Sequence, residues 1–152
     1  MATVSYFPTV GKIPFEGAES KNPMAFHYYA PERVVRGRKM KDWFRFSMAW
    51  WHTLCAEGAD QFGGGTKQFP WNASESALER AKAKMDAGFE FMQKIGIEYY
   101  CFHDVDLIDE APNAVDYERN LKEIVAMPNR NRPRPGLSCC GVRPMFSVTP
   151  DI

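Results

Sequence analysis

The sequence carries no net charge and contains no long apolar run. The 152 residues carry 19 lysines and arginines against 19 aspartates and glutamates, so the formal net charge at pH 7 is zero. A chain without a basic excess is not expected to bind nucleic acid or an anionic membrane surface through its charge. No apolar stretch approaches the length of a membrane span, and the first residues lack a secretory pattern. We therefore expect a cytoplasmic protein.

Cysteine is also scarce, and its spacing excludes two classes of protein. The four cysteines are Cys55, Cys101, Cys139 and Cys140. They form neither the paired Cys-x-x-Cys pattern of a zinc site nor a disulfide framework, so free thiols are expected. Apolar residues are plentiful by contrast, at 45% of the chain with 14% aromatic, which is enough to build one folded core.

The first part of the chain reads as irregular. Residues 1–43 hold four prolines and scattered aromatics with no sustained hydrophobic period, which predicts an arm with little regular structure. Residues 44–51, FRFSMAWW, are short, mostly apolar and aromatic, and are therefore typical of a buried strand. The glycine-rich segment that follows is predicted to be a loop.

The middle of the chain alternates between helical and strand patterns. Ser76 begins a capping box and predicts a helix that ends before Gly96, a residue well suited to a C-terminal cap. Residues 97–102 are almost continuously apolar, as in a parallel strand covered on both faces. A second helix is expected to begin at Pro112 or Asn113. This order of strand, helix, strand and helix favours an α/β fold with a parallel sheet.

Polar side chains gather where the second strand should end, in the run YYCFHDVDL. An aspartate three residues after a histidine, here Asp106 after His103, can accept a hydrogen bond from one ring nitrogen and leave the other for a ligand. The same spacing suits a histidine that is merely held in a loop, so both interpretations stay open. Trp50 and Trp51 close the first strand, and alternation should turn one inward and the other outward.

Three long segments of the chain resemble one enzyme family. They are YFPTVGKIPFEGAESKNPMAFHYY, MKDWFRFSMAWWHTLCAEGADQFGGGT and DAGFEFMQKIGIEYYCFHDVDLIDE, and with their neighbours they cover the chain from Tyr6 to Ala126. Together and in this order they are similar to xylose isomerase, specifically the longer bacterial class with an extended N-terminal arm. The resemblance implies an arm over residues 1–43 and, over residues 44–126, about two β/α units of a TIM (β/α)8 barrel.

The resemblance also implies a chemistry and a set of site residues. The family interconverts D-xylose and D-xylulose, and D-glucose and D-fructose, by a metal-assisted hydride shift, as a cytoplasmic homotetramer. Its catalytic histidine and aspartate correspond to His103 and Asp106, its substrate-binding tryptophan to Trp51, and an aromatic that enters a neighbouring subunit's pocket to Phe62. The family's two divalent ions are Mg²⁺, or alternatively Mn²⁺ or Co²⁺. They are held by residues from later strands, so no metal ligand is expected in this chain.

Residues 127–152 differ from the rest of the chain. Five of the 11 prolines and a cluster of arginines fall there, with Asp151 as the one acid after Asn129. Back-translated and read one base out of frame, this tail can encode KQAETGLKLLWGTANVFGHARY, which looks like the family's third strand and the loop after it. We therefore hypothesise a single-base deletion just after Ala126, in the gene or in its sequencing. A natural proline-rich tail that binds a partner is the alternative.

Two functions follow from these observations. The first is a xylose isomerase fragment, an N-terminal part that belongs to an enzyme family but is expected to be inactive alone because the metal ligands lie elsewhere. The alternative is a non-enzymatic sugar-binding or regulatory module that uses an isomerase-like half-pocket around Trp51 and His103. In either case residues 128–152 are expected to have little regular structure, because prolines remove backbone donors.

Overall fold

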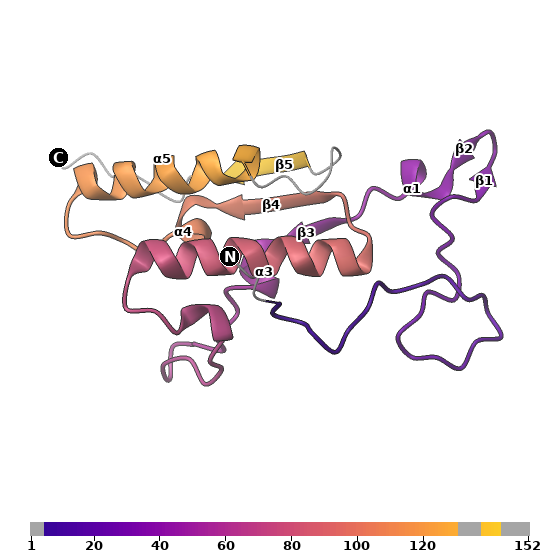
Figure 1. Ribbon diagram of the computed structural model, residues 1–152, viewed down its shortest axis with the longest axis horizontal. Coiled ribbons are helices and arrows are strands. Elements are labelled where there is room, and N and C mark those ends of the chain that lie inside the picture. The colour runs from indigo at the N-terminus through magenta and orange to yellow at the C-terminus, as the bar shows by residue number, and fades with distance from the viewer. Residues whose placement is uncertain (1–4, 131–137, 144–152) are drawn as a thin grey trace.

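A three-stranded sheet carries two long helices on one of its faces in the computed structural model of the protein (Figure 1). The structure describes residues 5–130 and 138–143. The strands run in the order β3 (Ser47–Ala49), β4 (Tyr99–His103) and β5 (Ser138–Arg143), and both pairings are parallel. The expected parallel α/β arrangement is thus confirmed for these residues. No closed barrel is present in the described ranges.

Helix α3 (Ala77–Ile95) begins and ends where the capping residues predict. The Ser76 hydroxyl accepts a hydrogen bond from the Glu79 amide at 3.4 Å, which satisfies one of the first-turn donors. At the other end Gly96 has φ 74°, a left-handed conformation that glycine adopts without steric cost. Its amide donates to the Met92 carbonyl, so the helix stops one residue before the turn into β4.

The core lies between α3 and the sheet. The apolar stripe of α3 buries Met85, Phe89 and Met92 against the side chains that β4 turns toward the helix, Tyr100 and Phe102. The fully buried indole of Trp50, the residue after β3, lies between these layers. It packs against α3 at Gly88, which has no side chain.

The contact between Gly88 and Trp50 leaves no room for a methyl group. A Cβ at Gly88 would lie 2.6 Å from Trp50 Cη2 and 2.8 Å from Leu54 Cδ1. We expect Gly88→Ala to lower the free energy of unfolding by about 1–3 kcal/mol through overpacking, although alanine is the better helix former by about 1 kcal/mol. Urea unfolding measures this change. Gly11→Ala is the control, since a Cβ there meets nothing within 4 Å; equal stability of the two variants would contradict the packing.

Helix α5 (Ala114–Arg130) follows its predicted cap, because the Asn113 side chain accepts from the Asp116 amide at 2.9 Å. On its apolar side Ile124 is fully buried, while Tyr117 and Leu121 are half-buried against the core. Val125 is 50% exposed, because it lies one residue round the helix from Ile124. None of the helices in the described ranges is long and apolar enough to cross a membrane.

The first strand is shorter than the sequence indicates. Residues 44–51 were expected to be extended, but β3 ends at Ala49 and a helical turn, α2 (Trp50–Thr53), follows. The correction has a tertiary cause, because the turn places Trp50 under α3, in ring contact with Phe89, Tyr100 and Phe102. Aromatic residues favour strands only where the pleat packs them well.

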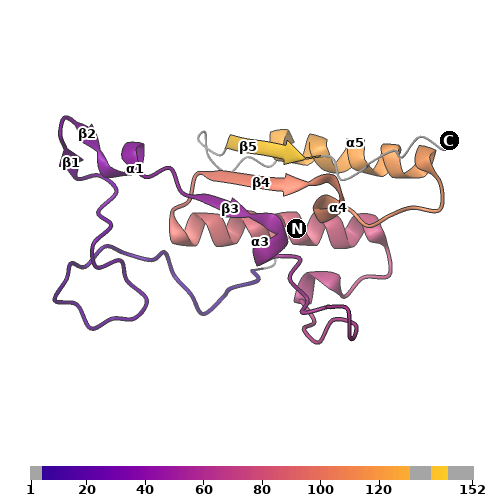
Figure 2. The same cartoon turned by 180° about the vertical axis from the view of Figure 1, so that it is seen from behind.

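The residues of strand β4 are more deeply buried on one face of the sheet than on the other. Tyr100 and Phe102 are buried, whereas Tyr99, Cys101 and His103 alternate with them at intermediate exposure. The apolar run had predicted cover on both faces, and the described residues supply it on the helix side alone (Figure 2). The face of β4 away from the helices therefore carries Tyr99, Cys101 and His103.

The tail contains more regular structure than expected. Helix α5 continues past Ala126 to Arg130, and Ser138–Arg143 form β5, parallel to β4 with a register shift between Tyr100 and Cys101. The expectation of little regular structure is wrong for these residues, because the ladder of β4 offers backbone partners regardless of side chain. Strand β5 stands at the sheet edge. Residues 131–137 and 144–152 lie outside the described residues, so the expectation is not tested there.

The arm is held against the outer face of α3 by polar contacts. Glu90 accepts from the Ser5 hydroxyl and from the amides of Tyr6 and Phe7, and Lys94 donates to two carbonyls of the arm. Further along, the arm forms a small antiparallel ribbon with a helical turn after it: β1 (Val34–Val35), β2 (Arg38–Lys39) and α1 (Met40–Trp43). A single 3₁₀ turn, η1 (Pro70–Asn72), leads into α3.

Candidate functional site

The carboxyl end of β4 brings together the histidine and the aspartate that the sequence singled out. Asp106 belongs to a short helical turn, α4 (Asp104–Leu107), that starts directly after the strand. Its Oδ2 lies 2.9 Å from His103 Nδ1 and accepts from the His103 amide at 2.7 Å. The side chains are 15% and 8% exposed, so the pair is nearly enclosed. A carboxylate only accepts, so Nδ1 donates to it, and in a neutral ring the lone pair is then on Nε2.

Trp51 forms one wall of this site. Its ring centroid lies 4.5 Å from that of His103, with the planes inclined by 44°. Trp51 is half-buried, while its neighbour Trp50 is fully buried in the core. One tryptophan thus faces the histidine and the other faces α3, as alternation predicts, although a helical turn rather than a strand places them. An aromatic face beside a polar ring can pack on the apolar face of a sugar.

Two further side chains reach the backbone of Asp106 from the opposite side. Lys84 of α3 donates from Nζ to the Asp106 carbonyl oxygen at 3.0 Å, and Cys55 Sγ lies 3.5 Å from the same oxygen. Sequence patterns missed the role of both residues, since lysine is usually a solvated residue and Cys55 was predicted only to be a free thiol. A signal was nevertheless present: Lys84 lies three residues after Ala81 and four before Gly88, on the apolar side of the helix.

Burial raises the pKa of the Cys55 thiol to about 11, chiefly by disfavouring the thiolate, and the nearby Lys84 ammonium offsets this only in part. At pH 8 we expect iodoacetamide to modify Cys55 about a hundredfold more slowly than an ordinary cysteine, because two pKa units remove that much thiolate. Mass spectrometry of the folded chain, with the urea-unfolded chain as reference, measures the two rates. Equal rates would contradict this environment.

No metal centre is present in the part of the chain that the structure describes. There, no three His, Cys, Asp or Glu side chains gather in a geometry that could hold an ion. Asp104 and Asp106 are both buried near His103, but Asp104 Oδ1 accepts from the Val105 amide and Asp106 Oδ2 is engaged by His103. The donor set at this strand end therefore serves internal hydrogen bonds and does not fit a divalent-ion cage.

Phe62, the fourth residue singled out by the sequence, stands apart from the pair. It is 86% exposed at the tip of a turn in which Asp60 Oδ1 accepts from the amides of Phe62 and Gly63, at 2.8 and 3.1 Å. A large aromatic ring held out in solvent by an ordered turn has little contact within its own chain. The structure thus brings Trp51, His103 and Asp106 together and leaves Phe62 projecting outward.

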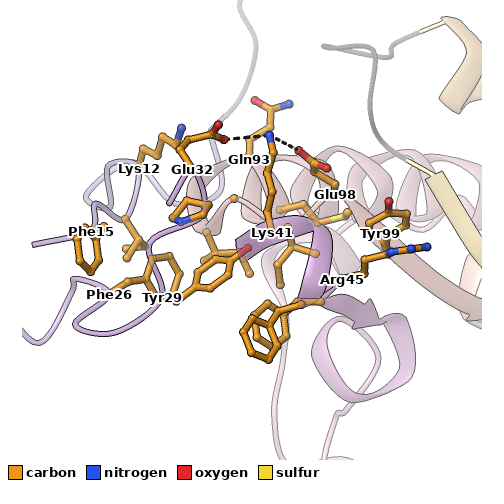
Figure 3. A pocket seen from close by; sticks show the side chains of 18 of the residues that line it. Lys12, Phe15, Phe26, Tyr29, Glu32, Lys41, Arg45, Gln93, Glu98 and Tyr99 are labelled. Carbon is orange, nitrogen blue, oxygen red and sulfur yellow. Dashed lines mark ion pairs between the residues drawn. The ribbon is translucent and has the colours of Figure 1, made fainter. Parts of the chain in front are cut away.

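A cavity of about 520 Å³ opens at the other end of the strands, between the arm and the start of β4 (Figure 3). Aromatic rings of the arm and the residues before β3 form much of its lining, and Lys41 lies between Glu32 and Glu98 at 2.9 and 3.9 Å. Its size makes it a second candidate. Ligands of parallel α/β folds, however, meet the carboxyl ends of the strands, which favours the end that carries His103.

Comparison with known proteins adds to this geometry. No protein-family model matches the chain. Proteins named xylose isomerase from Phocaeicola vulgatus and Bacteroides thetaiotaomicron are each 66% identical to it over 137 residues, which is 90% of the chain and 31% of each relative. Xylose isomerase 2 from Xanthomonas campestris is 46% identical over 143 residues, 93% of the chain and 32% of the relative. The chain is therefore similar to the xylose isomerases over 90% of its length, and it spans about a third of the length of the curated relatives it matches.

Proposed function

We propose that this chain is part of an aldose–ketose isomerase that interconverts D-xylose and D-xylulose, and that His103, Asp106 and Trp51 handle the sugar. The observation that carries the proposal is the enclosed pair of His103 and Asp106 at the carboxyl end of β4, with the Trp51 ring beside it. The names of the relatives supply the reaction class. The geometry supports His103 and Trp51 as the residues that meet the substrate, with Asp106 orienting the histidine.

The chemistry follows from the fixed imidazole. With its Nδ1 proton donated to Asp106, His103 offers the Nε2 lone pair to an anomeric hydroxyl. As Nε2 takes that proton, the bond between the anomeric carbon and the ring oxygen breaks. The imidazolium then returns the proton to the ring oxygen, which leaves the open-chain aldehyde on which isomerisation acts. Asp106 stabilises the imidazolium that forms and keeps the ring in one tautomer. Trp51 would cover the apolar face of the sugar and exclude water from that side.

The xylose isomerase family generally uses divalent metal ions. We propose that two such ions, Mg²⁺ or alternatively Mn²⁺ or Co²⁺, would supply Lewis-acid chemistry to the sugar. The described residues do not fit such ions, because the carboxylates near His103 are engaged in internal hydrogen bonds. No catalytic step is assigned to a metal in this chain. We propose that the ligands belong to further strands of a TIM barrel, and that Phe62 enters the pocket of a neighbouring subunit in a homotetramer.

The second candidate is a non-enzymatic sugar-binding or regulatory module that uses the half-pocket formed by Trp51 beside His103. Calorimetric titration with D-xylose, alongside an isomerisation assay with Mg²⁺ or Mn²⁺, separates the two. We expect no turnover by the 152-residue chain under either proposal. Binding that Trp51→Ala abolishes would favour the module. Metal-dependent turnover by this chain would contradict both.

A chimera with a full-length relative tests the enzymatic proposal. Residues 1–126 of the chain replace the matching part of the Phocaeicola vulgatus protein, to which the chain is 66% identical. The remaining two thirds of the relative then supply whatever the chain lacks. An active chimera whose turnover depends on His103 supports the proposed function. An inactive but folded chimera would count against it.

A further inference from the structure

Lys84 is a buried cation without a carboxylate partner in the described part of the chain. The residue is 7% exposed, and none of the ion pairs among the described residues includes it. Its ammonium donates instead to the backbone carbonyl of Asp106 at 3.0 Å. Burying an ammonium is costly unless its hydrogen bonds are strong and well placed. A purely structural role would be filled at lower cost by an apolar side chain.

The oxygen that Lys84 binds receives a second donor. Cys55, from the segment after α2, places Sγ 3.5 Å from the same carbonyl, and its raised pKa keeps it a neutral thiol that can donate. This carbonyl belongs to the last turn of α4, where helical carbonyls lack partners and a cation is favourable. Two elements distant in sequence thus converge on one backbone atom.

Hydrogen bonds consequently hold both the backbone and the side chain of Asp106. Lys84 and Cys55 fix its carbonyl, while its carboxylate accepts from the His103 amide and ring at 2.7 and 2.9 Å. The carboxylate can hold the ring in one orientation only if its own backbone does not move. The orientation of the imidazole therefore depends on two donors, Lys84 and Cys55, that contact the Asp106 carbonyl rather than the ring.

We propose that Lys84, assisted by Cys55, is a positioning residue that fixes the Asp106 backbone and thereby the tautomer and orientation of the His103 ring. It acts through Asp106 and does not meet the substrate. The importance of this role for catalysis rests on the proposed function, but the positioning itself does not. It can be measured in the 152-residue chain without sugar or metal.

Hydrogen exchange of the His103 amide is the readout, because that amide donates to the Asp106 carboxylate. We expect Lys84→Met to speed its exchange about tenfold relative to the amides of Tyr100 and Phe102, since leaving a buried carbonyl without its charged donor costs on the order of 1.4 kcal/mol locally. Lys82→Met is the matched control on the same helix. Lys82 is 30% exposed and pairs with Glu79 and Glu123. Its variant should keep the exchange rate of the His103 amide, relative to the two reference amides, within about twofold of the parent value.

The ¹⁵N shifts of the His103 ring provide a second readout that a merely structural role would not move. The parent chain should show protonated Nδ1 and bare Nε2, and Lys84→Met should show averaging between the two tautomers. Cys55→Ala should change both readouts in the same direction but less, and Cys55→Ser, which keeps a donor, should restore them. If Lys84→Met does not fold, the two Cys55 variants still test the proposal.

Two results would overturn the proposal. One is exchange that accelerates equally at His103, Tyr100 and Phe102 with unchanged ring shifts, which would reduce Lys84 to a stabilising residue. The other is Cys55→Ala and Cys55→Ser that behave alike in both readouts. Either result leaves the proposed function untouched, because neither readout involves turnover. An inactive chimera, conversely, leaves the positioning result intact.

Discussion

His103→Asn should lower the isomerisation rate of the chimera on the order of a hundredfold or more, the usual loss when a positioned acid–base group is removed. Asparagine keeps a polar side chain near Asp106 but has no nitrogen lone pair to take a hydroxyl proton. The asparagine amide can still donate to Asp106 Oδ2, which accepts from the histidine in the parent, so the replacement should fold like the parent. Steady-state kinetics with D-xylose and saturating Mg²⁺ measures the loss.

Asp106→Asn is the matched variant for that experiment. The aspartate acts on the sugar through His103, so we expect a smaller loss of kcat, about tenfold, with KM little changed. His52→Asn is the control, because His52 is exposed and its ring contacts Trp51 rather than Asp106. Full activity of the His103→Asn chimera would remove the role proposed for the pair.

Trp50→Ala should lower the free energy of unfolding by about 3–5 kcal/mol, the range found when a large buried aromatic is truncated. The indole is 0% exposed and contacts Phe89 and Tyr100 in the middle of the core. A loss of this size is a large fraction of the stability of an ordinary domain, which is about 5–15 kcal/mol. Denaturant unfolding followed by circular dichroism measures it.

Trp50→Phe provides the comparison within the same site. The Trp50 Nε1 has no hydrogen-bond partner among the described residues, so removing that donor forfeits no bond and relieves an unsatisfied buried group. We expect the phenylalanine variant to retain most of the stability that alanine loses. If Trp50→Ala unfolds at the same urea concentration as the parent, the packing of this core is wrong.

Local signals were sufficient to predict much of this fold. Ser76 and Asn113 accept amide hydrogen bonds at the starts of α3 and α5, and Gly96 takes the left-handed conformation after α3, because caps depend on neighbours three or four residues away. The pairing of His103 with Asp106 was predictable for the same reason, since the two lie three residues apart.

Tertiary contacts decided the features that sequence patterns missed. The early end of β3 reflects the seating of Trp50 against Gly88, two residues far apart in the sequence. The burial of Lys84 reflects a carbonyl 22 residues away, which no local pattern indicates. Strand β5 forms because β4 presents an open edge, whatever the composition around it. The frame-shift hypothesis for the tail stays a prediction, and sequencing the coding DNA around Ala126 checks it.

The central proposal is that this chain carries the sugar-handling residues of a xylose isomerase and that the residues which hold the metal ions belong to further strands. The most direct test is metal-dependent conversion of D-xylose to D-xylulose, measured side by side for the 152-residue chain and for the chimera. The claim predicts conversion by the chimera, abolished by chelation of the divalent ion, and none by the chain. Conversion by the chain itself, or none by a folded chimera loaded with Mg²⁺, would contradict it.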